Sequence, residues 1–256
     1  LEYIGGDTVD VLKRLKSTNV GFGLMILGAI LMVADIYLQT PGNILIAIGG
    51  SLLSSGIVLL FSVWFIESKA ENTLDNWGLT KIYKKRSEKS DDSDPRLKKA
   101  RNKLDVVAFG LTSFRETHGK DIETLLNKGV NVRILTMDPD CENVFLKQRE
   151  KEEGKQEGDI RNSINQLVEW ANKLNKKSRK GTIKIKGYRC MTLDFYWRVD
   201  DEIYIGPYWY KFSSQNTITY KYVSGKQGFD MYADYFEQLW DDEENNKVLT
   251  RPVRSR

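Results

Sequence analysis

The sequence predicts a two-helix transmembrane hairpin followed by an α/β domain built on a mixed sheet. Residues 44–66 form a stretch of 23 residues without a charge, and residues 20–38 form one of 19 residues in which Asp35 is the only charge. Beyond Glu67 the chain is rich in charge, and short apolar runs alternate there with segments of helical periodicity. This asymmetry excludes a purely soluble enzyme and a disordered chain.

The two apolar stretches are long enough to cross a bilayer. At about 1.5 Å per residue they reach about 34 Å and 28 Å, against a hydrocarbon core near 30 Å. The Pro-Gly pair at 41–42 is a turn signal between them, so residues 20–66 are expected to form a helical hairpin. A cleaved signal peptide is the alternative for the first stretch, but no small-residue cleavage site follows it and a second span comes next.

Charges flanking the hairpin predict its orientation. Lys13, Arg14 and Lys16 precede the first helix, basic residues from Lys81 onward follow the second, and the turn between them has no charge. The positive-inside rule then places both termini in the cytoplasm, with the hairpin in a bacterial inner membrane. Residues 1–19 are expected to form an amphipathic cytoplasmic lead along the membrane surface.

Three residues of the hairpin are candidates for membrane or pore function. Gly50 and Ser54 have a small-xxx-small spacing that permits close helix approach, either within the hairpin, which is the favoured interpretation, or between protomers. Asp35 lies a few residues before the turn, where water can reach it. In an oligomer, Asp35 from each chain is alternatively expected to form an acidic ring that favours cations.

The remaining chain divides into a linker, a domain and a tail. Residues 67–104 are predicted to be a basic stalk, because positions 81–103 hold ten Lys or Arg against four Asp or Glu. A helix is expected to continue out of the membrane, break at the Ser90-to-Pro95 segment, and resume at Arg96. Residues 105–242 are the predicted α/β domain, and residues 243–256 a polar tail. The basic run 176–189 is interpreted as a solvated loop.

Hydrophobic periodicity gives the elements of the domain. A strand at 105–110, a helix at 120–128 and a strand at 130–137 predict a right-handed parallel βαβ unit. The elements expected after it are a helix from Asp159, strands at 182–186, 190–199, 202–206 and 216–223, and a helix at 229–240 with an aromatic core-facing stripe.

The layout of residues 104–240 resembles the phospholipase D family. Residues 191–198 alternate cleanly, an Asp200-Asp201 turn follows, and the next strand ends on Gly206. The family's site pattern is His-x-Lys, then Asp, then Gly-Ser, and here Thr192 and Asp194 occupy the His and Lys positions while Gly206 precedes proline. The only histidine is His118, outside the matching position and before a predicted helix near a different strand. The family's nucleophilic mechanism needs one imidazole to attack and another to protonate the leaving group, so the resemblance implies a non-catalytic domain.

Residues near the ends of the predicted strands are candidates for ligand binding. They are Thr112, Ser113, Arg115, Asp138, Thr192, Asp194, Tyr196, Arg198, Tyr208 and Trp209. Thr112 and Ser113 are expected to cap a helix whose N-terminus favours an anion, and Arg198 offers a guanidinium fork for phosphate. The alternative is structural: the hydroxyls only cap, Arg198 pairs with Asp194, and the aromatic side chains pack.

The two cysteines predict neither disulfides nor metal. Cys141 and Cys190 are too few and too far apart for a disulfide-built secreted domain, and they lack metal-ligand spacing. The sequence therefore predicts no cofactor and no metal site.

The combined architecture resembles the membrane effectors of bacterial antiphage systems of the CBASS and Hailong type. That resemblance implies a homo-oligomer in the lipid bilayer, a nucleotide or oligonucleotide ligand, and a nucleotidyltransferase partner that makes it. One alternative is a membrane-tethered phosphodiesterase or phospholipase. Another is a membrane scaffold with a protein partner.

Overall fold

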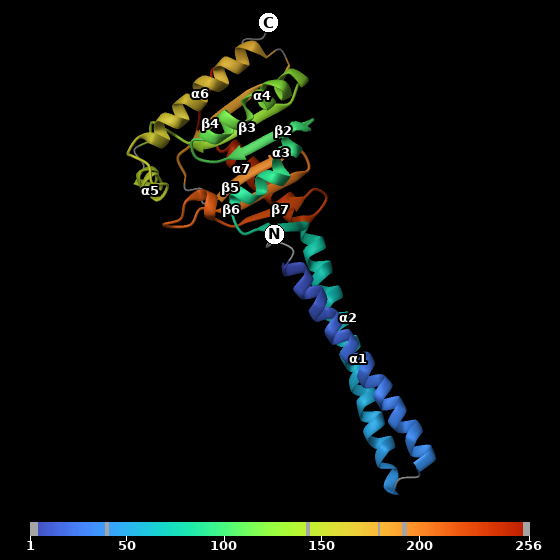
Figure 1. Ribbon diagram of the computed structural model, residues 1–256. Coiled ribbons are helices and arrows are strands. Elements are labelled where there is room, and N and C mark those ends of the chain that lie inside the picture. The colour runs from blue at the N-terminus through green and yellow to red at the C-terminus, as the bar shows by residue number, and fades with distance from the viewer. Residues whose placement is uncertain (1–4, 39–40, 142–143, 179, 191–193, 253–256) are drawn as a thin grey trace. The chain divides into compact units, whose positions relative to one another are not determined.

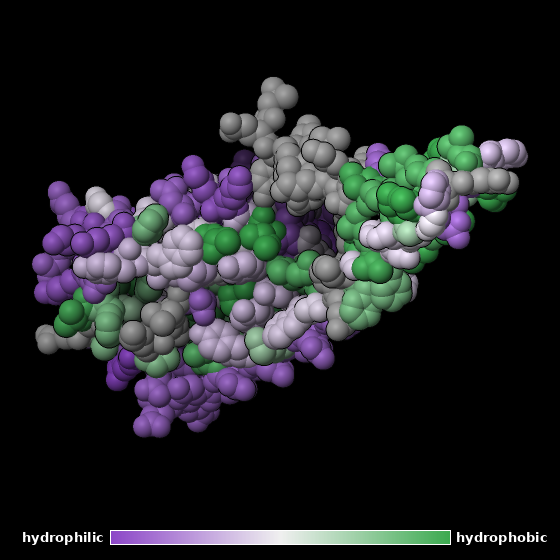
Figure 2. All heavy atoms as spheres, turned by 90° about the horizontal axis from the view of Figure 1, so that it is seen from below, coloured by the Kyte–Doolittle hydropathy of each residue, from purple (hydrophilic) through white to green (hydrophobic). Residues whose placement is uncertain are grey.

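The computed structural model describes residues 5–38, 41–141, 144–178, 180–190 and 194–252 of the chain (Figure 1). The chain separates into two compact units, Leu1–Thr73 and Leu74–Arg256. Hydrophobic side chains gather on the helical hairpin, whereas hydrophilic ones cover much of the visible face of the other unit (Figure 2).

The first unit contains the two apolar helices that the sequence predicts. Helix α1 covers Gly5–Leu38, a 3₁₀ turn covers Pro41–Asn43, and α2 covers Ile44–Trp77. The stretches Thr18–Leu38 and Pro41–Phe65 are long and apolar enough to cross a membrane. Only 17% and 11% of their most apolar windows is buried, so most of both surfaces is available to lipid.

Glycine pairs set the contact between α1 and α2. A Cβ atom added to Gly49 would lie 2.6 Å from the carbonyl oxygen of Gly28, and one added to Gly56 would lie 2.7 Å from that of Gly21. By contrast, a Cβ on Gly50 would meet nothing within 4 Å. The favoured interpretation, that Gly50 and Ser54 pack the hairpin against itself, is therefore wrong. The next residue on a helix is rotated by about 100°, which turns Gly50 away from the partner that Gly49 touches.

Asp35 lies inside the hairpin. Its side chain is only 4% exposed, and it follows Gly28 by the same seven residues that separate Gly28 from Gly21. This burial places the carboxylate within its own hairpin, whereas the acidic ring expected of an oligomer stays a prediction.

We expect Asp35→Leu to lower the free energy of unfolding of the hairpin by about 1–2 kcal/mol, because the Asp35 side chain is buried and its polar interactions are lost. Asp35→Asn keeps a hydrogen-bond acceptor and is expected to cost less. Denaturant unfolding in bicelles, followed by Trp64 fluorescence, measures both. A more stable Asp35→Leu hairpin would show that the carboxylate is retained at a cost to folding.

The second unit is a mixed α/β domain, as predicted, and its described residues form an eight-stranded sheet. The strand order is β1-β7-β6-β5-β2-β3-β4-β8, and β2, β3 and β4 run parallel to one another while the other pairs are antiparallel. The strands are β1 (Leu79–Tyr83), β2 (Lys103–Val107), β3 (Asn131–Met137), β4 (Ile183–Tyr188), β5 (Asp194–Val199), β6 (Glu202–Pro207), β7 (Thr219–Val223) and β8 (Asn246–Val248). The helices are α3 (Ser90–Lys98), α4 (Thr112–Lys128), α5 (Val144–Glu152), α6 (Asp159–Lys177) and α7 (Gln227–Asp241).

Helices cover both faces of this sheet (Figure 1). Side chains of α3, α4 and α6 pack on one face with Val106 and Trp197, and those of α7 pack on the other with Val107 and Tyr196. The alternation predicted for residues 194–198 is therefore confirmed, but both sets of side chains are buried. The elements that pack over each face of β5 therefore decide which face contributes to the candidate site.

The segment predicted to be a stalk belongs largely to the sheet domain. It supplies the edge strand β1, a 3₁₀ turn at Arg86–Lys89, and α3, which runs through Pro95 where a break is expected. Pro95 has no N–H to donate to the carbonyl of Asp91, but Asp91 is exposed to water, and the buried Leu97 anchors the helix.

Other boundaries also differ from the prediction. Part of the expected polar tail forms β8, which pairs with β4, and α5 was not predicted. The basic run 176–189 is not a solvated loop, because it contains β4 and the buried Lys186. The expected strand start at 190 is replaced by Asp194, and residues 191–193 lie outside the described residues.

Candidate functional site

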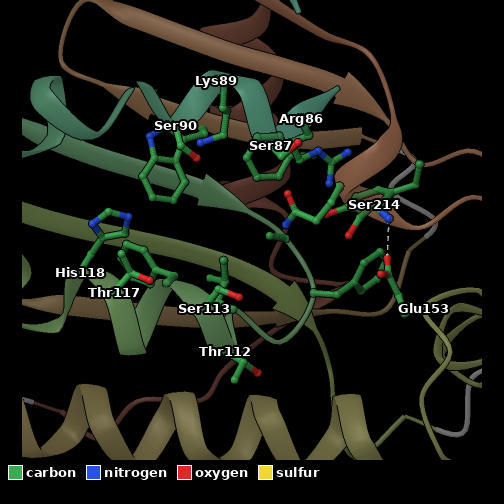
Figure 3. Close-up of a pocket in the computed structure, with 18 of the residues that line it drawn as sticks. Arg86, Ser87, Lys89, Ser90, Thr112, Ser113, Thr117, His118, Glu153 and Ser214 are labelled. Atoms are coloured by element: carbon green, nitrogen blue, oxygen red, sulfur yellow. Dashed lines mark hydrogen bonds between the residues drawn. The ribbon is translucent and has the colours of Figure 1, made fainter. Parts of the chain in front are cut away.

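A cavity of about 500 Å³ opens where β2 ends and α4 begins (Figure 3). One side is formed by the turn at Arg86–Lys89 and the opposite side by the first turns of α4. Phe195 and Trp197 of β5 and the aromatic rings of Phe109 and Tyr208 complete the apolar part of the wall. Clefts of this size are typical of sites for small ligands.

The loop after β2 aims the N-terminus of α4 at this cavity. Gly110 and Leu111 both adopt left-handed backbone conformations, with φ of 62° and 53°. Such a conformation is unfavourable for leucine and is often found at functional sites. No described side chain caps α4, because the hydroxyl of Thr112 bonds to that of Ser163 on α6 and Ser113 is exposed at the cavity. The expectation that Thr112 and Ser113 cap the helix is wrong, and its free N–H groups favour an anion.

Arg86 is a buried cation in the wall of the cavity and is 4% exposed. Its Nη2 donates hydrogen bonds to Thr217 Oγ1 at 3.0 Å and to the Pro207 carbonyl at 3.3 Å. The guanidinium carbon lies 4.3 Å from the ring centre of Phe195 and 4.6 Å from that of Tyr208. Nε is buried without a hydrogen-bond partner among the described residues. Burial lowers the pKa of Arg86, which shows how little water compensates the charge.

Lys89 is a second buried cation in the same wall and is 7% exposed. Its Nζ donates to Ser93 Oγ at 3.2 Å and lies 4.4 Å from the ring centre of Trp197. Burial lowers the pKa of Lys89 to about 8. Within the described part of the chain, no carboxylate forms a salt bridge with Arg86 or Lys89. Asp94 also lines the cavity and its charge raises the pKa of Lys89, but burial outweighs this attraction. Buried charge that is only partly compensated is costly, so an anion in the cavity would offset part of that cost.

Glu153 closes another side of the cavity and is already paired with a cation. Its carboxylate accepts hydrogen bonds from the guanidinium of Arg149, the hydroxyl of Ser213 and the backbone N–H of Ser214. Burial by itself raises the pKa of Glu153, but these hydrogen bonds outweigh it and the net shift is downward. Glu153 therefore stays ionised and forms its salt bridge with Arg149 rather than with Arg86, although its charge also attracts the Arg86 guanidinium at longer range.

His118 also lines the cavity, contrary to the prediction, because it lies within α4 rather than before a helix near another strand. Its Nε2 is 3.6 Å from Asp94 Oδ1 and its Nδ1 is 3.7 Å from Asp121 Oδ2, both beyond ordinary hydrogen-bond distance. One imidazole fits a single proton transfer but not the pair of roles that a nucleophilic phosphoryl mechanism needs.

Of the sequence-predicted residues, Thr112, Ser113 and Tyr208 line the cavity. Arg115 does not, because its Nη2 bonds to Gln166 on α6. Asp138 is fully buried, where it accepts a hydrogen bond from Arg189. Trp209 is 42% exposed and does not line the cavity, and Thr192 lies outside the described residues.

The other three predicted residues lie on β5 and do not line the cavity. Tyr196 stacks on Phe236 of α7, and Arg198 lies over the ring of Phe229 and donates to the Asp200 carbonyl rather than to Asp194. Asp194 is half-buried, and burial raises its pKa. Their neighbours Phe195 and Trp197 face the cavity instead, so ligand binding by Asp194, Tyr196 and Arg198 stays a prediction outside this cavity.

Sequence reasoning missed the two cations that define the site. Arg86 and Lys89 stand in a run with other basic residues, and only the packing of the 3₁₀ turn against β5 and β6 separates them from their exposed neighbours. The sequence indicates them only indirectly, because the strands against which Arg86 and Lys89 pack are rich in aromatic residues.

The chain matches no family model and no curated protein. Among solved structures, it is similar to the archaeal chromatin protein TrmBL2, with 14% identity over 78% of this chain and 70% of that one and a TM-score of 0.42. It is also similar to NucT from Helicobacter pylori, with 11% identity over 66% of this chain and 97% of that one and a TM-score of 0.40. A third similar structure is Nuc from Salmonella typhimurium, a phospholipase D family member, with 9% identity over 61% of this chain and 88% of that one and a TM-score of 0.39. A likeness at this level of identity concerns the fold and transfers no residue's role to this chain.

Proposed function

We propose that this protein is a bacterial inner-membrane effector whose cytoplasmic α/β domain binds a phosphate-bearing signal, a nucleotide or oligonucleotide. The observation that carries the proposal is the pair of buried cations, Arg86 and Lys89, which face the uncapped N-terminus of α4 across the cavity and form no salt bridge among the described residues. Arg86, Lys89 and the N-terminus of α4 all favour a negatively charged group in the cavity. The cavity volume of about 500 Å³ suits a ligand the size of one or two nucleotides.

The position of the cations in the chain supports a link to the membrane helices. Helix α2 ends at Trp77, β1 follows at Leu79–Tyr83, and the next turn carries Arg86 and Lys89. Within this unit the end of α2 is tied to the domain by an ion pair between Asp75 and Lys226 at 2.5 Å. A ligand that binds two states of this segment differently shifts their populations and so controls the assembly of hairpins.

The proposed effector acts with partners in the cell. One hairpin cannot enclose a pore, so disruption of the membrane in antiphage defence requires a homo-oligomer. A nucleotidyltransferase is the proposed source of the signal. Both termini are proposed to be cytoplasmic, so a reporter fused after Arg256 reads cytoplasmic and one inserted at Gly42 reads periplasmic.

Mass spectrometry of small molecules that co-purify with the full chain tests ligand binding directly. The native protein is expected to retain a phosphate-bearing compound, and Lys89→Met is expected to lose most of it. Lys186→Met is the matched control, since Lys186 is also a buried lysine over an aromatic ring, Trp240, but lies outside the cavity. Equal retention by both variants contradicts the proposed site.

A membrane-tethered phosphodiesterase is the competing function, favoured by His118 in the cavity wall. Turnover of the co-purified compound or of a generic phosphodiester, lost in His118→Ala, would establish the enzyme instead. Binding without turnover, unchanged in His118→Ala, supports the effector.

Anion binding is expected to weaken as the pH rises through about 8, because Lys89 loses its proton there when the cavity is empty. The stability of the folded domain is expected to change with pH in the opposite direction. The pKa of Lys89 in the folded protein lies below its ordinary value of 10.5, so the burial penalty is present below pH 8 and fades between about 8 and 10.5, where stability rises. Calorimetric titration with inorganic pyrophosphate across this range measures the first effect. Lys89→Met should flatten the pH profile, and a profile that stays steep would assign it to another group.

A further inference from the structure

A group of large aromatic side chains is exposed in the loop after β6. Trp209, Tyr210 and Phe212 are 42%, 66% and 49% exposed, with Lys211 between the last two. Trp209 and Phe212 meet edge to face, with ring centres 5.6 Å apart. We name residues 209–212 the aromatic loop. Contiguous exposed apolar surface of this kind marks an interaction site.

The aromatic loop is held in this form from the inside. Arg149 of α5, a buried cation, donates to the carbonyl oxygens of Trp209 at 3.5 Å and Phe212 at 2.8 Å. The backbone N–H of Lys211 donates to Glu152 Oε1 at 3.2 Å, and Lys211 has a φ of 61°. Because the backbone of the loop is tied to α5, the outward placement of its aromatic side chains is part of the fold.

The start of α5 extends the same apolar surface. Val144 and Phe145 are 77% and 48% exposed, and Phe145 lies one turn before Arg149, in a helix that sits beside the aromatic loop (Figure 1). Lys147 pairs with Glu157 at 2.6 Å, Arg149 pairs with both Glu152 and Glu153, and Lys211 lies within the aromatic loop, 5.1 Å from the ring centre of Tyr210. The surface therefore exposes apolar side chains, and charged side chains at this end of the domain are largely paired with one another.

We propose that the aromatic loop and the start of α5 rest in the interfacial region of the bilayer that holds α1 and α2. Two candidate spans in the same chain keep this domain next to a membrane. Trp and Tyr favour the headgroup region, because their rings are apolar and their N–H or O–H groups stay hydrated. With Lys211 as the one cation in the loop, apolar contact rather than attraction to anionic lipid is expected to supply most of the binding. This inference rests on the membrane anchoring in the proposed function and is independent of the ligand.

A fluorophore on single cysteines of the full chain tests the contact. The background is Cys141→Ser with Cys190→Ser, and an environment-sensitive label is attached at Tyr210→Cys. The matched control is Met231→Cys on α7, an apolar residue that is 51% exposed, and the span control is Val58→Cys, which is 63% exposed on α2. Each protein is placed in nanodiscs of phosphatidylcholine alone or with added phosphatidylglycerol, with nitroxide-labelled lipids as quenchers.

The label at position 210 is expected to be quenched by nitroxides near the headgroups more than by those at the chain ends, equally in both lipid mixtures. The label at position 231 is expected to stay accessible to aqueous iodide. Iodide access at 210 equal to that at 231 overturns the inference, as does protection from iodide without lipid quenching, which indicates a protein contact. Absence of quenching at position 58 would instead overturn the membrane anchoring.

Discussion

Arg86→Met is expected to weaken the binding of inorganic pyrophosphate by about ten- to a hundredfold, since charge-assisted hydrogen bonds are worth about 1.5–3 kcal/mol. The same change is expected to leave the free energy of unfolding unchanged or higher. Arg86 is 4% exposed and has no carboxylate partner among the described residues, so methionine removes a desolvated charge and fills a similar volume. Calorimetry and denaturant unfolding measure the two effects on the same protein.

The opposite signs distinguish a ligand site from a structural cation. Arg133 is the control, because it is bound by Asp105 and Glu237 on the other face of the sheet. Arg133→Met leaves the buried Asp105 uncompensated and is expected to destabilise the domain without altering pyrophosphate affinity until it unfolds. If Arg86→Met instead destabilises as Arg133→Met does and binds pyrophosphate normally, Arg86 is structural.

Gly49→Leu is expected to disrupt the hairpin, whereas Gly50→Leu is expected to leave it intact. The Cβ of residue 49 would lie 2.6 Å from the Gly28 carbonyl, so the helices have to separate, and overpacking of this kind costs about 1–3 kcal/mol or more. At Gly50 there is nothing within 4 Å. Denaturant unfolding in bicelles compares the two variants, which differ by one position and share the same chemistry.

The same pair tests how hairpins assemble. The face with Gly50 and Ser54 is left open by α1, and the hydroxyl of Ser54 bonds to the Gly50 carbonyl, so the face presents a smooth helix surface. Gly50→Leu is expected to reduce the oligomer population and the loss of membrane potential in cells, at unchanged hairpin stability. An unaltered oligomer distribution in mass photometry would remove this face from the contact between protomers.

The sequence by itself determined the features that depend on local or summed properties of the chain. The two apolar helices follow from the length of their uncharged stretches. The parallel βαβ unit follows from periodicity and short connections, and the alternation along β5 follows from the geometry of a strand. In each case the residue pattern within one segment is sufficient to predict the element.

Only the tertiary structure decided which alternative each segment adopts. Gly49 rather than Gly50 meets α1, because one step along a helix rotates the contact away from the partner. The cavity lies on the face of β5 that carries Phe195 and Trp197, not on the face that carries Tyr196 and Arg198. Helices bury both faces of β5, so the alternation of residues does not indicate which elements cover each face. The cations of the site were hidden among exposed basic residues, since burial of a charge depends on strands far away in the chain that receive it.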